Sequence, residues 1–161
     1  MNRIYILLGG SNSGKSSVLR GLKRNSNEKN IFIKLSSFQE LVEFCNYKKV
    51  IQKLKKYIGE CESKAQDKDV SNFVIVIAFA LRRNKKSELG VDCIVKPLKY
   101  LKSMRNYQIR VIHLHRDIIK LRDVDSFIED NIEVGLILQS KNPVNRRQDN
   151  NARMLRRFIF E

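Results

Sequence analysis

The chain has 161 residues, of which 42% are apolar, so its length predicts about one domain with a proper buried core. Its 32 lysines and arginines exceed its 17 aspartates and glutamates, which gives a formal net charge of +15. This composition excludes a disordered or collagen-like chain and favours anionic partners, nucleic acid among them, although a lysine-rich translation of an AT-rich genome would give the same balance.

The longest apolar run, residues 73–81, is too short to span a bilayer. The three cysteines, Cys45, Cys61 and Cys93, form no metal-type or redox-type pair, which favours reduced thiols. The first apolar run begins close to Met1 and leaves no room for a signal peptide. We therefore expect a cytoplasmic protein with no membrane partner.

Residues 9–16 read Gly-Gly-Ser-Asn-Ser-Gly-Lys-Ser and fill the template Gly-x-x-x-x-Gly-Lys-[Ser/Thr]. The β-prone run 4–8 precedes them, and apolar residues at helical spacing follow them. This context predicts a P-loop, in which backbone N–H groups and a helix amino terminus surround phosphates. The predicted contacts to a nucleoside triphosphate are Gly9, Gly10, Ser11, Asn12, Ser13, Gly14, Lys15, Ser16 and Ser17.

Within this loop the two polar side chains next to the last glycine have separate expected roles. Lys15 would carry its charge to the β- and γ-phosphates of ATP, and the hydroxyl of Ser16 would hold Mg²⁺. ATP and Mg²⁺ are therefore the expected cofactors.

Residues 31–35 predict a second strand, and the capping box Ser37-x-x-Glu40 predicts the start of a helix. Lysines within 48–56 would crowd the exposed side of this helix, and residues 59–71 predict a loop or a short helix. The expected buried face of the helix consists of Phe38, Leu41, Val42, Cys45, Leu54 and Ile58.

The continuous apolar run 73–80 is typical of a strand covered on both faces, as in the middle of a parallel sheet. Residues 133–139 fit a helix or a strand equally well, and residues 157–160 fit either the end of a helix or a last strand. The remaining expected elements are a helix over 95–107, a strand over 109–115, a helix over 117–130 and a basic helix over 145–158.

Strands that alternate with helices predict an α/β fold with a parallel sheet. We expect a three-layer P-loop NTPase fold in one domain, residues 1–161, with about five strands and helices on both faces. A lid segment is expected around residues 131–153.

The other motifs narrow the choice among P-loop proteins. A GTPase needs Asn-Lys-x-Asp for guanine, whereas residues 84–87 read Asn-Lys-Lys-Ser and lack the Asp. A motor or transporter ATPase needs an apolar strand that ends in a carboxylate, and the run 73–80 does not. Small P-loop kinases remain.

Two further segments resemble members of that class. Residues 76–89, Val-Ile-Ala-Phe-Ala-Leu-Arg-Arg-Asn-Lys-Lys-Ser-Glu-Leu, are similar to a strand-and-arginine segment of gluconokinases and adenylylsulfate kinases. Residues 146–153, Arg-Arg-Gln-Asp-Asn-Asn-Ala-Arg, resemble the lid-exit pattern of adenylate kinases. The resemblance implies that Arg82 lies near the acceptor and that Arg147 and Arg153 clamp phosphates.

The chain departs from these families at the acceptor site. It lacks the Asp-Gly-Phe-Pro-Arg and Thr-Gly-Asp-x-x-Arg motifs of adenylate kinases and the second-strand Asp of gluconokinases. Candidates for a base or a metal-linked carboxylate are Glu40, Asp117 and Asp149, each of which fits a helix cap or a solvated acid as well. His113 and His115 show no third ligand at zinc spacing.

The resulting expectation is a phosphotransferase that passes the γ-phosphoryl group of ATP to a small acceptor, most readily a nucleotide or nucleoside. Lys15, Arg82, Arg147 and Arg153 would be its catalytic residues. Two alternatives stay open. One is a nucleic-acid-associated NTP-binding protein such as a polynucleotide kinase, and the other is a degenerate kinase fold that binds nucleotide without turnover.

Overall fold

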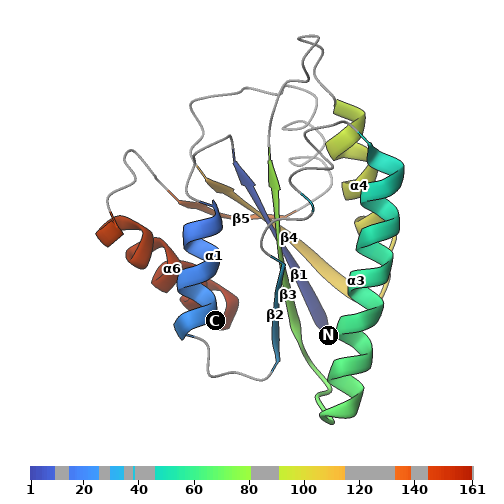
Figure 1. Ribbon diagram of the computed structural model, residues 1–161, viewed down its shortest axis with the longest axis horizontal. Coiled ribbons are helices and arrows are strands. Elements are labelled where there is room, and N and C mark those ends of the chain that lie inside the picture. The colour runs from blue at the N-terminus through green and yellow to red at the C-terminus, as the bar shows by residue number, and fades with distance from the viewer. Residues whose placement is uncertain are drawn as a thin grey trace.

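The structure is a computed structural model that describes residues 1–9, 15–25, 30–34, 38, 46–80, 91–114, 133–138 and 145–160 (Figure 1). Strands and helices alternate along the described chain, as the hydrophobic patterns predict. In chain order the elements are β1 (Asn2–Gly9), α1 (Lys15–Asn25), β2 (Ile31–Lys34), α3 (Tyr47–Asp67), β3 (Val74–Ala80), α4 (Val91–Lys102), β4 (Tyr107–Leu114), β5 (Glu133–Leu138) and α6 (Asn145–Phe160).

The strands form one five-stranded sheet in the order β2-β3-β1-β4-β5, and every neighbouring pair is parallel. Helices α1 and α6 cover one face, and α3 and α4 cover the other (Figure 1). The expected α/β class, with a parallel sheet between helical layers, is therefore confirmed.

The distribution of helices follows from the strand order. The chain passes from β1 to the edge strand β2, returns to β3, and then continues in the same direction to β4. Connections between parallel strands are right-handed. The connection from β1 to β2 runs in one direction across the sheet, and those from β2 to β3 and from β3 to β4 run in the other, so their helices lie on opposite faces. Accordingly α1 lies on one face, and α3 and α4 lie together on the other.

Strand β1 is buried on both faces and divides the interior into two cores. Ile4, Ile6 and Leu8 are wholly buried against the α3 and α4 side. Tyr5 and Leu7 are wholly buried against the α1 and α6 side. Successive side chains of a strand point to opposite faces, so a continuous apolar run is what a central parallel strand requires.

Helix α3 is longer than its sequence pattern predicts. It continues to Asp67, so most of residues 59–71, expected to form a loop or a short helix, belongs to this long helix. The buried positions Val50, Leu54 and Ile58 continue at helical spacing through Cys61 and Ala65. These two small side chains continue the buried face of the helix through a segment whose other residues are mostly polar.

The amino-terminal boundary of α3 is set by Asn46. Its side-chain oxygen accepts a 3.2 Å hydrogen bond from the backbone N–H of Lys49, which is an N-cap interaction. The capping box expected at Ser37 lies outside the described residues. Phe38, the single described residue of that segment, is 1% exposed and belongs to the α3 and α4 core.

The carboxyl-terminal part resolves two open alternatives. Residues 133–138 form strand β5, which pairs with β4. The register shifts at Gly135, because Val111 is opposite Val134 whereas Ile112 is opposite Leu136. This bulge breaks the alternation that would have identified the strand. Residues 157–160 are helical within α6, so the alternative of a last strand there is wrong.

Candidate functional site

The described residues on both sides of the predicted P-loop are joined by a hydrogen bond. The Nζ atom of Lys15, the first residue of α1, donates a 2.8 Å hydrogen bond to the backbone oxygen of Gly9, the last residue of β1. Lys15 is 5% exposed, one of two buried polar or charged side chains among the residues that the structure describes. Its ammonium group therefore links the two ends of the glycine-rich segment, Gly9 at the end of β1 and Lys15 at the start of α1.

The position of Gly9 in the sheet is typical of a ligand site. In register, Gly9 lies opposite Ala80 of β3 on one side and Leu114 of β4 on the other, so it stands in the middle of the carboxyl edge. The chain leaves β1 toward α1 on one face and leaves β3 toward α4 on the other. Ligands of open parallel sheets bind at such reversals, in the crevice outside the strand ends.

The amino end of α1 has an uncompensated positive potential. Its first turn contains no acidic residue, whereas its last turn carries Lys23 and Arg24. Cations near the carboxyl end stabilise the helix dipole, and the amino end is left for an anion from outside the helix. Ser16 and Ser17 lie in this first turn and are half-buried. Backbone N–H groups, the Lys15 ammonium and two hydroxyls thus converge on one edge of the sheet.

The remaining predicted site residues fall into two groups. Arg153 is described and lies exposed on α6, which packs beside α1, so the helix of Lys15 and that of Arg153 are neighbours (Figure 1). His113 is half-buried on β4. Outside the described residues, or without a described side chain, are Gly10, Ser11, Asn12, Ser13, Gly14, Glu40, Arg82, His115, Asp117, Arg147 and Asp149.

The expected lid range, residues 131–153, is partly accounted for. Residues 133–138 are hydrogen-bonded in the central sheet as β5, and residues 145–153 belong to α6. The described part of this range therefore belongs to the main layers of the domain. The lid segment expected around residues 131–153 stays a prediction, and residues 139–144 of that range lie outside the described residues.

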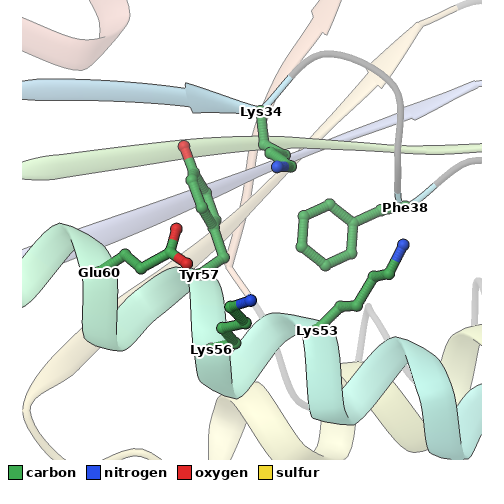
Figure 2. A pocket seen from close by; sticks show the side chains of 6 residues that line it. All are labelled: Lys34, Phe38, Lys53, Lys56, Tyr57 and Glu60. Carbon is green, nitrogen blue, oxygen red and sulfur yellow. The ribbon is translucent and has the colours of Figure 1, made fainter.

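The structure also contains a cationic pocket that the sequence pattern did not reveal (Figure 2). It has a volume of about 180 Å³ and lies between the end of β2 and the side of α3. We call it the lysine pocket. Its lining residues are Lys34, Phe38, Lys53, Lys56, Tyr57 and Glu60.

The aromatic side chains of the lysine pocket are fixed by the core. The Phe38 ring lies 6.0 Å from the Tyr57 ring and 6.3 Å from the Phe79 ring, centroid to centroid. The Nζ atom of Lys34 lies 5.3 Å from the centroid of the Tyr57 ring, a cation–π contact. Burial is the main cause that raises the pKa of the Tyr57 phenol, which therefore stays neutral.

The lysine pocket is distinct from the Lys15 site. Lys34 pairs with Ile77, and Ile77 with Ile6, so Lys34 is two strands from β1 and level with a position three residues before Gly9. That is about 10 Å across the sheet and about 10 Å along it. Phe32, on the same face of β2 as Lys34, packs in the α3 and α4 core, whereas α1 packs on the opposite face.

Comparisons with known proteins find no matching family model, no matching curated protein and no matching solved structure. None of the described helices has the length and apolar character that crossing a membrane requires. Within the described ranges, no three or more His, Cys, Asp or Glu side chains are grouped to hold a metal ion.

Proposed function

We propose that this chain is a phosphotransferase with a P-loop kinase fold, which binds a nucleoside triphosphate at residues 9–17 and passes its γ-phosphoryl group to a small acceptor. The observation that carries the proposal is the 2.8 Å hydrogen bond from Lys15 Nζ to the oxygen of Gly9. It keeps a buried ammonium group at the carboxyl edge of a parallel sheet, between a strand and the helix that follows it.

The chemistry of this lysine favours a phosphate as its alternative partner. A carbonyl oxygen is a neutral acceptor, whereas a phosphate oxygen carries negative charge and also attracts the ammonium group as a counter-ion. A triphosphate that reaches the loop can therefore replace Gly9 as the acceptor of the Lys15 ammonium. The acid-free first turn of α1 adds backbone donors and the positive end of its dipole to the same region.

Mg²⁺ fits the proposed site through Ser16. Its hydroxyl is half-buried in the first turn of α1, directly after Lys15. A hydroxyl and phosphate oxygens are hard ligands of the kind that Mg²⁺ prefers, and this cation commonly binds through the substrate's own phosphates. When bound, the ion would neutralise charge on the transferring group, while Lys15 stabilises the same charge from the protein side.

The acceptor would lie beside the triphosphate at the carboxyl edge. Arg82 follows Ala80 by two residues in the sequence, and Ala80 is paired with Gly9. Arg147 and Arg153 belong to α6, the neighbour of α1. We assign these arginines to the acceptor and to the phosphates, because phosphoryl transfer depends mostly on positioning and on charge stabilisation. A nucleotide or nucleoside is the acceptor class proposed.

Isothermal titration calorimetry tests the binding step. Purified protein with ATP and Mg²⁺ should release or absorb heat in a saturable way, and Lys15→Ala should lose the signal while keeping the wild-type circular dichroism spectrum. Lys23→Ala, on the exposed last turn of the same helix, is the matched control and should bind normally. Absence of binding by the wild type with any nucleoside triphosphate would overturn the proposal.

Labelled ATP tests the transfer step. The protein should move label from γ-labelled ATP to a member of pooled nucleosides, nucleotides or sugar acids, and Lys15→Ala should not. Binding without transfer to any pool would leave a nucleotide-binding protein and reject the phosphotransferase. Transfer by Lys15→Ala at the wild-type rate would reject the assigned role of this lysine.

A further inference from the structure

The lysines of α3 are concentrated in its amino-terminal half. Its first eleven residues, 47–57, include five lysines and no acid, whereas residues 58–67 include three acids and one lysine. Cations in the first turn of a helix oppose its dipole, so Lys48 and Lys49 lie at the less favourable end. An external anion bound along this half would offset the repulsion among these charges.

The lysines on one side of this half-helix border the lysine pocket. Lys49, Lys53 and Lys56 are spaced by four and three residues, so they form one stripe along the exposed side of α3. From the strand side Lys34 reaches the same space, and the Phe38 ring lies between Lys34 and Lys53 (Figure 2). The three lysines of the stripe extend over about 10 Å of helix, from Lys49 to Lys56.

The interior of the pocket suits one flat ring. Its volume of about 180 Å³ has room for a group the size of a base and not for a folded peptide. The rings of Tyr57 and Phe38 are among its lining side chains, and Lys34 reaches it from the end of β2 (Figure 2). Aromatic rings bordered by lysines are the pattern with which proteins bind unpaired bases and the phosphates that join them.

We propose that the lysine pocket binds single-stranded nucleic acid, with one base beside Tyr57 and the backbone phosphates along Lys34, Lys49, Lys53 and Lys56. The bases of a duplex are stacked and paired inside the helix, so a duplex offers no base to the pocket. A mononucleotide would use the pocket alone and leave Lys49, which lies outside its lining, without a role. This site is separate from the Lys15 site and does not depend on phosphotransfer.

Fluorescence anisotropy with a labelled oligothymidylate of about 16 nucleotides tests the proposal. The logarithm of the association constant should fall with the logarithm of salt concentration with a slope of about −3, since each of four contacts contributes about −0.7. The double variant Lys53→Gln/Lys56→Gln should bind about 25-fold more weakly at about 0.1 M salt, with a slope near −1.4.

The matched control removes the same charge from the other end of α3. Lys64→Gln/Lys68→Gln changes two exposed lysines near the carboxyl end and should leave both affinity and slope almost unchanged. Glu60→Gln removes the acid found among the described residues that line the pocket and should strengthen binding. Tyr57→Leu should weaken binding about fivefold or more, whereas Tyr57→Phe, which keeps the ring, should bind like the wild type.

Four results would overturn the proposal. They are equal losses in the two double-lysine variants, no oligonucleotide binding at low salt, tighter binding of a duplex of the same length, and displacement by an equimolar mononucleotide. Thermal melts of each variant show whether it is folded. Lys15→Ala should bind the oligonucleotide normally, so failure of the phosphotransferase proposal and failure of this one give different results.

Discussion

The hydroxyl of Tyr107 donates a 2.6 Å hydrogen bond to Oε1 of Glu62, and so joins the first residue of β4 to the second half of α3. These residues are 45 positions apart in the chain. A bond to a carboxylate is stronger than one between neutral groups, and Tyr107 is buried while Glu62 is exposed. The bond holds the carboxyl-terminal half of α3 against the sheet.

A double-mutant cycle measures this contact. We expect Tyr107→Phe and Glu62→Ala each to lower the free energy of unfolding by about 1 kcal/mol, with most of that loss shared in the double variant. Glu62→Gln keeps an acceptor and should lose less than Glu62→Ala. Urea denaturation gives the values, and strictly additive losses would show that the bond contributes nothing.

The same region predicts a loss of stability at alkaline pH. Burial raises the pKa of the Cys61 thiol from 9.0 to about 11 and also raises the pKa values of the Tyr57 and Tyr107 phenols. The unfolded chain releases these protons at lower pH than the folded chain does. Stability from Cys61 is therefore complete below about pH 9 and falls as the pH rises to about 11.

Urea midpoints of the wild type and Cys61→Ala, compared from about pH 8 to about pH 11, test this prediction. The variant removes the thiol but keeps every other titrating group, so effects of lysine deprotonation cancel in the difference. The gap between the two proteins should shift in favour of Cys61→Ala as the pH rises. A constant gap would contradict the raised pKa of the thiol.

Arginine should not replace Lys15 in binding ATP with Mg²⁺. The side chain is 5% exposed, and its ammonium group donates a 2.8 Å hydrogen bond to the backbone oxygen of Gly9. A guanidinium group is planar and wider, and it binds as a fork rather than as a compact charge. We expect Lys15→Arg to weaken binding of ATP with Mg²⁺ by at least about tenfold in calorimetry. Wild-type affinity in this variant would mean that charge alone is required.

Two substitutions of Asn46, the N-cap of α3, should change the melting temperature in opposite directions. Asn46→Ala removes the acceptor for the Lys49 N–H and should cost about 1 kcal/mol, which lowers the melting temperature by about 2–4 °C. Asn46→Asp keeps the acceptor and adds a negative charge beside the helix amino end and two lysines, so it should raise the melting temperature. Added salt should reduce that gain, and a gain that is independent of salt would contradict the electrostatic explanation.

The class of fold was predictable because its signals are local. The uninterrupted apolar run before Ala80 required a strand with both faces covered, and the structure buries that strand in the middle of a parallel sheet. The strand and helix expected around Gly9 and Lys15 are also present. Both predictions depend on residues that are close together in the chain.

The errors arose where small or distant residues decide the structure. Cys61 and Ala65 carry little apolar surface, so the second half of α3 looked like a loop or a short helix. Gly135 interrupts the alternation of β5. The lysine pocket depends on β2 and α3 meeting in space, which brings Lys34 against Tyr57 although no spacing in the sequence relates them. Tertiary contacts of this kind have no counterpart in a local pattern.

The alternation along β1 also determines which substitutions can be combined. Ile6 and Leu7 are adjacent in the chain, yet the first has α3 and α4 for neighbours and the second has α1 and α6. Substitutions at Leu7 should therefore change the packing of α1, the helix that begins with Lys15. Substitutions at Ile6 should change the packing of α3, which carries the three lysines of the stripe beside the lysine pocket, Lys49, Lys53 and Lys56. Because the two residues share the backbone of β1, a double-mutant cycle would measure how strongly the two cores are coupled through the strand between them.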